Sequence, residues 1–245
     1  MTRTIVLGTG HTVPARVVTN QDLAKLMNTS DEWIVERSGI RQRHWVREGE
    51  RGVDLARGAA TRALEMAGLD PRDIDAIVYA SSTPDHFFPG NAVYLQHEMD
   101  MGRIPAFNVV NACSGFLYAL QVADALITTG AYRRILTIGQ EIQSTRLDKS
   151  DSGRATSVLF ADGAGAVVLG TTDDPGRGVQ GFDLHGDGAF ADRLWVDGPG
   201  AMYHPPISQQ QIDDGRYWIK MEGREVFRQA VTRMPESVET LLARL

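Results

Sequence analysis

The chain has 245 residues, which is enough for one large domain or two small ones with a sizeable core. Its formal net charge of -6 and its lack of any run of Lys and Arg argue against a general nucleic-acid binder. One cysteine permits no intrachain disulfide and no zinc cluster, and no stretch approaches the ~18 apolar residues of a membrane span. The N-terminus enters a strand without an apolar signal region, so we expect a soluble cytoplasmic protein.

Alternating strand and helix patterns fill the first part of the chain. A strand over residues 2–7 leads to Gly8-Thr9-Gly10, which is superficially similar to a dinucleotide-binding loop. Position 13 is Val rather than Gly, and Pro14 interrupts any helix that would follow, so we expect no nicotinamide or flavin site. The next expected elements are helices capped at residues 19–20 and 29–32, an amphipathic helix over 53–68, a buried strand over 74–80 and a helix over 91–100.

The stretch from Ala106 to Gly130 carries the only cysteine of the chain. An apolar run over residues 106–110 predicts a buried strand, a turn follows, and a helix begins near Phe116. Because this helix is apolar nearly all round, we expect it to lie inside the protein. Cys113 falls where the strand ends and the helix begins. The helix dipole and the free backbone N–H groups there favour a thiolate nucleophile and can hold an oxyanion, whereas the alternative role of a lone cysteine is a small buried hydrophobe.

The remainder of the chain predicts more strands and a long final helix. We expect strands over 134–139, 156–160, 165–170 and 178–185, long loops over 186–216, and a helix over 221–245. The Asp-Gly pair within residues 161–164 predicts a hairpin turn between two of these strands. The alternation of strands and helices predicts an α/β sheet with helices on both faces.

Five segments lie in the order and at the spacing of one enzyme family: Ser30–Arg41 (SDEWIVERSGIR), Phe88–Pro89, Asn111–Phe116 (NACSGF), Phe160–Ala166 (FADGAGA) and Met221–Phe227 (MEGREVF). Through them the chain resembles β-ketoacyl-acyl-carrier-protein synthase III, a branch of the thiolase superfamily. The resemblance implies a thiolase-like α/β fold, with mixed sheets and helices on both faces around a buried central helix. It also implies that residues 1–170 form the N-terminal half, which carries the nucleophile, and that residues 171–245 begin the C-terminal half.

The same resemblance implies an activity. An acyl group passes from acyl-CoA to Cys113, and a decarboxylative Claisen condensation with malonyl-acyl-carrier protein then initiates fatty-acid synthesis. The CoA thioester is a substrate, so the resemblance implies no bound cofactor and no metal. It does imply a cytoplasmic homodimer.

Individual residues match positions with known roles in that family. Trp33 and Arg154 match positions that sandwich the CoA adenine, and Arg37 matches a residue that meets the CoA phosphates. The other implied contacts are with CoA at Thr29, Gly223 and Phe227, with the acyl chain at Phe88, Phe87 and Phe160, and with an acidic carrier protein at Arg228. Without the resemblance, a surface arginine or a core tryptophan is the simpler interpretation.

The chain departs from the family pattern towards its end. The family completes its site with a histidine in a Pro-His-Gln-type motif, an asparagine further on, and a Gly-rich loop that supplies a second oxyanion donor. None of the six histidines lies in such a context, so we expect the chain to be the first part of a longer protein, without condensation activity by itself. Two alternatives stay open: a related acyltransferase or condensing enzyme of secondary metabolism, and a non-catalytic binder of CoA or carrier protein.

Overall fold

The computed structural model describes residues 2–245, which form two compact units. The first unit is made of three stretches, up to Arg16, Val46–Ile142 and Asp162–Phe182. The second is made of Val17–Trp45, Gln143–Ala161 and Asp183–Leu245. Each unit therefore combines segments that are far apart in the sequence.

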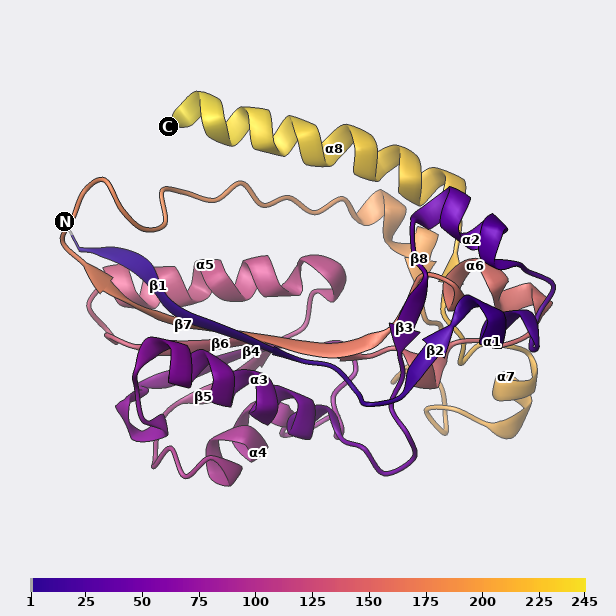
Figure 1. Ribbon diagram of the computed structural model, residues 1–245, viewed down its shortest axis with the longest axis horizontal. Coiled ribbons are helices and arrows are strands. Elements are labelled where there is room, and N and C mark those ends of the chain that lie inside the picture. Colours follow the sequence, from indigo (N-terminus) through magenta and orange to yellow (C-terminus); the bar gives the residue numbers. More distant parts are fainter. Residues whose placement is uncertain (1) are drawn as a thin grey trace. The chain divides into compact units, whose positions relative to one another are not determined.

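The first unit contains a five-stranded mixed sheet (Figure 1). Its strands, in spatial order, are β1 (Arg3–Thr12), β7 (Asp162–Thr172), β6 (Ile135–Ile142), β4 (Ala76–Ala80) and β5 (Ala106–Val109). β7 is antiparallel to both of its neighbours, whereas β6, β4 and β5 run parallel to one another. The α/β sheet predicted from the sequence is confirmed.

Helices cover both faces of this sheet. α3 (Gly52–Ala67) and α4 (Asn91–Glu98) lie on one face, and α5 (Gly115–Thr128) lies on the other (Figure 1). β4 shows the reason, because successive side chains of a strand point to opposite faces. Ile77 and Tyr79 join the hydrophobic cluster that contains α3, whereas Val78 joins the cluster that contains α5. Every residue of β4 is buried, as its continuous apolar run predicts.

Two glycines of β1 let α3 approach the strand closely. A Cβ atom added at Gly8 would collide with the carbonyl oxygen of Ala63, and one at Gly10 would collide with that of Ala59. β1 runs through both glycines without ending. In this structure the Gly-x-Gly sequence therefore serves the packing of a helix on a strand.

The second unit arranges short elements around a separate hydrophobic cluster. Its helices are α1 (Asn20–Ala24), α2 (Asp31–Ser38), α6 (Arg154–Ser157), α7 (Gln209–Asp213) and α8 (Gly223–Arg244), and its strands are β2 (Val17–Thr19), β3 (Gln42–His44), β8 (Leu194–Trp195) and β9 (Lys220–Met221). Short 3-10 helices in the two units are η1 (Pro71–Asp73), η2 (Ala112–Ser114), η3 (Ser144–Arg146), η4 (Asp151–Gly153) and η5 (Gly188–Arg193). Leu23, Ile34 and Trp45 are fully buried in this cluster. The predicted caps are confirmed, since the Thr19 side chain caps α1 and the Ser30 side chain caps α2.

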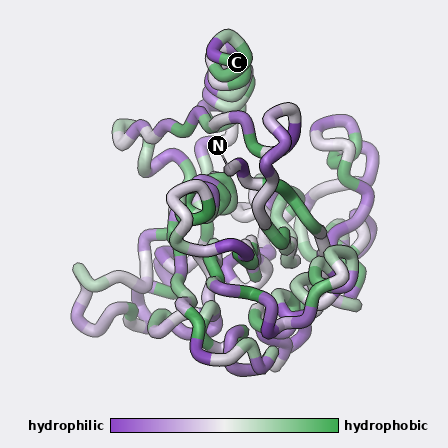
Figure 2. The backbone as a smooth tube through the Cα atoms, turned by 90° about the vertical axis from the view of Figure 1, so that its left-hand side faces the viewer, coloured by the Kyte–Doolittle hydropathy of each residue, from purple (hydrophilic) through white to green (hydrophobic). Residues whose placement is uncertain are grey.

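α8 is the long final helix predicted from the sequence, and one of its faces is exposed and apolar. Phe227, Val231, Met234, Val238 and Leu242 recur at helical spacing, and each is more than half exposed. Figure 2 shows this helix near the C mark, with hydrophobic and hydrophilic colours both present along it. We call these five residues the apolar stripe of α8.

The predicted strand over residues 156–160 and the predicted turn over 161–164 are wrong. The hydroxyl groups of Thr156 and Ser157 donate to the backbone carbonyls of Gly153 and Asp148, and this local bonding favours the short helix α6. β7 already begins at Asp162, whose carboxylate accepts a hydrogen bond from the Val46 amide over 2.7 Å. The Asp-Gly pair therefore lies inside a paired strand.

Three expectations about burial and strands are also wrong. β5 is the edge strand of the sheet, with Phe107 39% exposed, rather than a buried strand. α5 buries only one side, through Ala119, Ala123 and Ile127, and Leu117 is half exposed, so in the described residues it is not a fully buried central helix. Residues 178–185 form no strand. Within residues 2–245, no helix has the length and apolar character to cross a membrane, and no three His, Cys, Asp or Glu side chains gather where they could hold a metal ion.

Candidate active site

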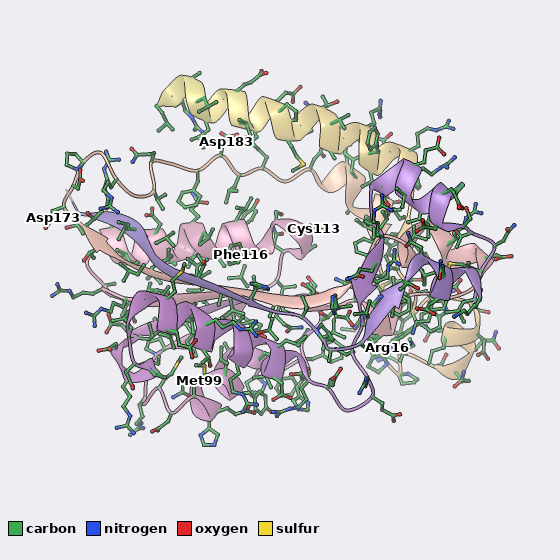
Figure 3. The ribbon with its side chains drawn as sticks, in the orientation of Figure 1. Arg16, Met99, Cys113, Phe116, Asp173 and Asp183 are labelled. Atoms are coloured by element: carbon green, nitrogen blue, oxygen red, sulfur yellow. The ribbon has the colours of Figure 1, made fainter. Side chains whose placement is uncertain are left out.

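Cys113 lies between the end of β5 and the beginning of α5. It belongs to the turn η2, which leads directly into the first residue of the helix. Ala112 has a φ of +43°, in the left-handed region that residues other than glycine seldom adopt. Such backbone strain is typical of functional turns. The thiol is exposed, and Figure 3 shows Cys113 and Phe116 at the start of α5.

The N-terminus of α5 has no side-chain cap. The hydroxyl of Ser114, its N-cap residue, accepts a hydrogen bond from the Asn111 side-chain amide over 3.2 Å and donates to the Asn111 carbonyl over 3.4 Å. The amides of the first helical turn therefore lack the side-chain acceptor that commonly caps a helix. These N–H groups and the positive end of the helix dipole follow Cys113 directly, an arrangement suited to an oxyanion.

Small residues of the sheet make room for the first turn of α5. A Cβ atom added at Gly115 would make an ordinary contact of 3.6 Å with the Ala80 side chain in β4. A Cβ atom added at Gly139, in β6, would lie only 3.0 Å from the ring of Phe116. Because position 139 carries no side chain, Phe116 can lie against the sheet and fix the turn that bears Cys113.

Three of the residues implied to bind CoA lie together in the second unit. Trp33 and Arg37 are one turn apart on α2, and the Arg37 guanidinium carbon is 4.4 Å from the Trp33 ring centroid. The guanidinium carbon of Arg154, the first residue of α6, is 4.6 Å from the same centroid. Arg154 Nη1 also donates to the Asn28 carbonyl over 2.8 Å, which holds the side chain beside the ring. An indole flanked by guanidinium groups is suited to a nucleotide base and its phosphates.

The other residues implied to contact CoA lie in the same unit. Thr29 precedes the N-cap of α2, and its buried hydroxyl oxygen has no hydrogen-bond partner. Gly223 begins α8, and Phe227 follows one turn later with 69% of its surface exposed. A cavity of about 530 Å³ in this unit is lined by residues of α6, α7 and β9. The part that Thr29, Gly223 and Phe227 take in CoA binding stays a prediction.

The aromatic residues implied to line an acyl pocket divide between the two units. Phe87 and Phe88 lie in the loop between β4 and α4 and are 74% and 87% exposed. Phe160 lies in the second unit, packed against the cluster of Trp45, whose Nε1 donates to the Phe160 carbonyl over 3.2 Å. Their common role in one pocket stays a prediction.

Arg228 of α8 is paired within its own helix. Its guanidinium forms a 2.7 Å salt bridge with Glu225, one turn earlier. This hydrogen-bonded pair lowers the pKa of Glu225 and raises the pKa of Arg228. A carrier protein would therefore meet a neutralised pair at this position, and the docking role of Arg228 stays a prediction.

Several residues that shape the first unit carry no motif in the sequence. Asp85 caps α3 from a distant loop, and Asn91 is completely buried at the start of α4. The available signal, one polar residue shortly before Phe87 and Phe88 and one shortly after them, is not specific. Ala112 carries no signal at all, because Gly, Asn and Asp are the residues that commonly adopt a positive φ.

Comparison with known proteins shows relatives of this arrangement. The family described as 3-oxoacyl-[acyl-carrier-protein (ACP)] synthase III matches residues 107–188, which contain Cys113. A β-ketoacyl-[acyl-carrier-protein] synthase III of Cereibacter sphaeroides is 47% identical over 247 residues, which cover 98% of this chain and 72% of the relative. The crystal structure of a 3-oxoacyl-(acyl carrier protein) synthase III from Pseudomonas aeruginosa is similar with a TM-score of 0.87 and 37% identity, over 99% of this chain and 71% of that one. The priming β-ketosynthase from the R1128 polyketide biosynthetic pathway is similar with a TM-score of 0.82 and 31% identity, over 96% and 68% of the two chains.

The mixed sheet with helices on both faces is a thiolase-like fold, and together with these relatives it defines a condensing acyltransferase. The chain belongs to the β-ketoacyl-acyl-carrier-protein synthase III family, whose reaction is the initiating condensation of fatty-acid synthesis. The family, the thiolase-like α/β fold and the activity that the five sequence motifs predict are therefore confirmed. The chain spans 72% of the length of its Cereibacter sphaeroides relative.

Proposed function

We propose that Cys113 is the nucleophile that accepts the acyl group from acyl-CoA. The observation that supports this role most is the position of the thiol, which is exposed on a strained turn before a helix without a side-chain cap. Attack of the thiolate on the thioester carbonyl forms a tetrahedral intermediate, whose oxyanion is stabilised by backbone N–H groups of this turn. Collapse of the intermediate expels the CoA thiolate and leaves an acyl thioester on Cys113.

The nucleotide part of acyl-CoA binds at Trp33. Its adenine lies against the indole beside Arg154, and its phosphates pair with Arg37, whose guanidinium fork matches phosphate oxygens. The guanidinium carbons at 4.4 and 4.6 Å from the Trp33 centroid bring these three residues together, and a guanidinium group would move off the indole to admit the adenine. Thr29, Gly223 and Phe227 complete the CoA contacts in this proposal.

In the reaction of the family, malonyl-acyl-carrier protein is the second substrate. Loss of carbon dioxide from its malonyl group leaves an enolate, which attacks the carbonyl carbon of acyl-Cys113. The Cys113 thiolate leaves, and the β-ketoacyl product stays on the carrier protein. Arg228 would exchange its bond to Glu225 for a carboxylate of the acidic carrier. The division of the chain into family halves at residues 170 and 171 belongs to the same proposal.

The enzyme acts as a homodimer in the cytoplasm. β5 is the edge strand of the sheet, and an unpaired strand edge is a template for a strand of a second copy. Phe107 and Val110, at this edge, are 39% and 72% exposed, which favours a protein partner. An exposed free thiol at Cys113 is suited to a reducing compartment.

Incubation with acetyl-CoA and measurement of the intact mass test the nucleophile. We expect the protein to gain the mass of one acetyl group, and the Cys113→Ala variant to gain none. Peptide mapping then locates the acetyl group. Equal acetylation of the Cys113→Ala variant, or acetylation at another residue, would disprove the assignment.

A condensing enzyme of secondary metabolism is the second candidate. The likeness to the priming β-ketosynthase of the R1128 pathway, at 31% identity, is the observation that favours it. The rates of acyl transfer from acetyl-CoA and from longer and branched acyl-CoA thioesters distinguish the two candidate functions. A folded protein that binds CoA without gaining acyl mass would instead support a non-catalytic binder.

A further inference from the structure

The loop between β4 and α4 combines an exposed aromatic tip with fixed backbone on both sides. Residues 81–90 form this loop, and Phe87 and Phe88 at its tip are 74% and 87% exposed. Exposed loop tips are ordinarily the mobile parts of a fold. In this loop, side chains of β6 and α4 bind the backbone on the two sides of the tip, and the Asp85 side chain of the loop binds the backbone of α3.

Glu141 of β6 fixes the first side of the loop. Its carboxylate accepts hydrogen bonds from the Ser82 amide over 2.8 Å and from the Thr83 hydroxyl over 2.5 Å. The same Thr83 oxygen accepts a hydrogen bond from the Ile142 amide over 2.8 Å. Because bonds to a charged carboxylate are among the stronger hydrogen bonds, the loop is held firmly to the end of β6.

Asp85 fixes the middle of the loop to helix α3. Its carboxylate accepts hydrogen bonds from the Gly52 amide over 2.6 Å and from the Val53 amide over 2.9 Å. The N-cap residue of α3, Arg51, makes no side-chain cap, so Asp85 fills that role from a distant segment. The exposed Phe87 is only two residues away along the chain.

Asn91 fixes the second side of the loop and joins it to Asp85. Its Oδ1 accepts a hydrogen bond from the Asp85 amide over 3.0 Å, and its Nδ2 donates to Gln140 Oε1 over 3.1 Å. Tyr79 donates to the same Gln140 oxygen over 3.0 Å, and burial raises the pKa of Tyr79, so the phenol keeps its proton. These side chains are buried, and removal of one partner would leave the others unpaired away from water.

Gly90 and Asn108 complete this second side. Gly90 has a φ of +84°, and a Cβ atom there would lie 2.6 Å from Asn108 Oδ1. That oxygen accepts a hydrogen bond from the Ala92 amide over 3.2 Å. Asn108 lies on β5, the strand that leads to Cys113, so the loop and the strand before the nucleophile share one anchored framework.

We propose that Asp85 and Asn91 are positioning residues for the selection of acyl-chain length. Neither acts on the substrate; they fix the backbone on both sides of Phe87 and Phe88, and with it the depth of the pocket that these aromatic rings close. The inference rests on the proposed function, in which Phe88 limits the acyl chain. When the Asp85 bonds are lost, the tip moves and longer acyl chains gain access.

The rates of acyl transfer to Cys113 from acetyl-CoA and from octanoyl-CoA test this role. Each rate is measured from the intact mass of the protein over time. The variants are Asp85→Ala, Phe88→Ala and the double variant, with Asp70→Ala as the matched control, since Asp70 caps η1 by a 3.0 Å bond to the Arg72 amide. We expect both single variants to raise the octanoyl-to-acetyl rate ratio by at least about fivefold. We expect no further increase in the double variant, because the two residues act through one tip. The ratio of the control stays unchanged.

Cleavage by chymotrypsin after Phe87 provides a readout that does not depend on activity, whereas Pro89 protects the bond after Phe88. We expect faster cleavage in Asp85→Ala than in the unaltered protein, and no change in Asp70→Ala. If Asp85→Ala does not fold, Asp85→Asn carries both measurements, because it keeps the shape of the side chain and loses one of the two acceptors.

The outcomes separate the positioning role from the proposed function. If Phe88→Ala leaves the rate ratio unchanged, Phe88 does not bound the acyl chain, and the pocket assignment fails together with the selectivity role. If Phe88→Ala changes the ratio but Asp85→Ala changes neither the ratio nor the cleavage, the positioning role alone is overturned. An equal loss of both rates in Asp85→Ala, with an unchanged ratio, would show a merely structural residue.

Discussion

The hydroxyl of Ser237 lies 2.7 Å from the carboxylate of Asp183 and 2.9 Å from the backbone carbonyl of the same residue. His185 and Arg244 contact this carboxylate as well, and the Asp183 side chain is only 6% exposed. Figure 3 shows Asp183 beside α8. Because α8 has no buried residue, this polar contact is a main attachment of its second half within the second unit.

Acidification should release this attachment. The hydrogen bond from Ser237, and after it the bond from His185, lowers the pKa of Asp183. A carboxyl group whose pKa is lowered by folding stabilises the protein above its unfolded pKa of ~4 and loses this contribution as the pH falls through the folded value. We therefore expect Asp183→Asn to lower the melting temperature near neutral pH and to have little effect at strongly acidic pH.

Thermal unfolding of both proteins across this pH range measures the difference. Asp213→Asn is the matched control, since Asp213 is an exposed carboxylate of the same unit. A loss of melting temperature that stays the same from neutral to strongly acidic pH would contradict the role of the Asp183 charge.

Gly139→Ala should slow the acylation of Cys113. The added methyl group would lie 3.0 Å from the Phe116 ring, so the ring and the first turn of α5 must shift. Small displacements of a nucleophile are costly, and we expect a rate reduction of about tenfold. Gly165→Ala is the control, because Gly165 pairs with Gly139 across β6 and β7 and its Cβ would meet nothing within 4 Å. Equal acylation rates in the two variants would show that displacement of the Phe116 ring does not affect Cys113.

Trp33→Ala should weaken the use of acyl-CoA through its nucleotide. Loss of stacking on the indole is worth ~1–3 kcal/mol, so we expect the KM for acetyl-CoA to rise about tenfold. Acetyl-pantetheine lacks the nucleotide, and its KM should stay unchanged. Trp195→Ala is the control, since Trp195 also stacks with a cation, Lys220, in the same unit. An equal rise of the KM for both thioesters would mean that Trp33 stabilises the fold and does not bind the nucleotide.

The apolar stripe of α8 should bind a hydrophobic dye. We expect Val231→Lys combined with Val238→Lys to reduce the fluorescence of bound 8-anilinonaphthalene-1-sulfonate, because both valines are more than half exposed. Thr232→Lys combined with Glu239→Lys places lysines at other exposed positions of the same helix and serves as the control. If the control reduces the signal as strongly, the dye responds to charge and the stripe is not its site.

Local signals predicted much of the fold. Ser30 is the N-cap of α2 and Gly68 is the C-cap of α3, as expected. Capping depends on residues within one turn of the helix end, so it can be predicted locally. The place of Cys113 before α5 follows from the same kind of pattern. Phe116 and the other apolar residues of α5 gave no information on which side of the helix is covered, since burial depends on distant segments.

Long-range contacts explain what the sequence could not show. The segment after Thr156 is held by a distant residue, since the buried Arg43 donates to the Val158 carbonyl over 3.1 Å, although a β-branched residue favours a strand. Asp85 became recognisable only when the fold brought it to the start of α3. The positive φ of Ala112 has no signal in the sequence either.

The interleaving of the two units has a consequence for protein engineering. The backbone passes from one unit to the other five times, after residues 16, 45, 142, 161 and 182. No single cut of the polypeptide yields either unit whole, and any contiguous fragment that contains one whole unit also contains segments of the other. Separate production of one unit would require redesigned linkers that rejoin its three pieces, so a contiguous fragment is a poor substitute for the 245-residue chain.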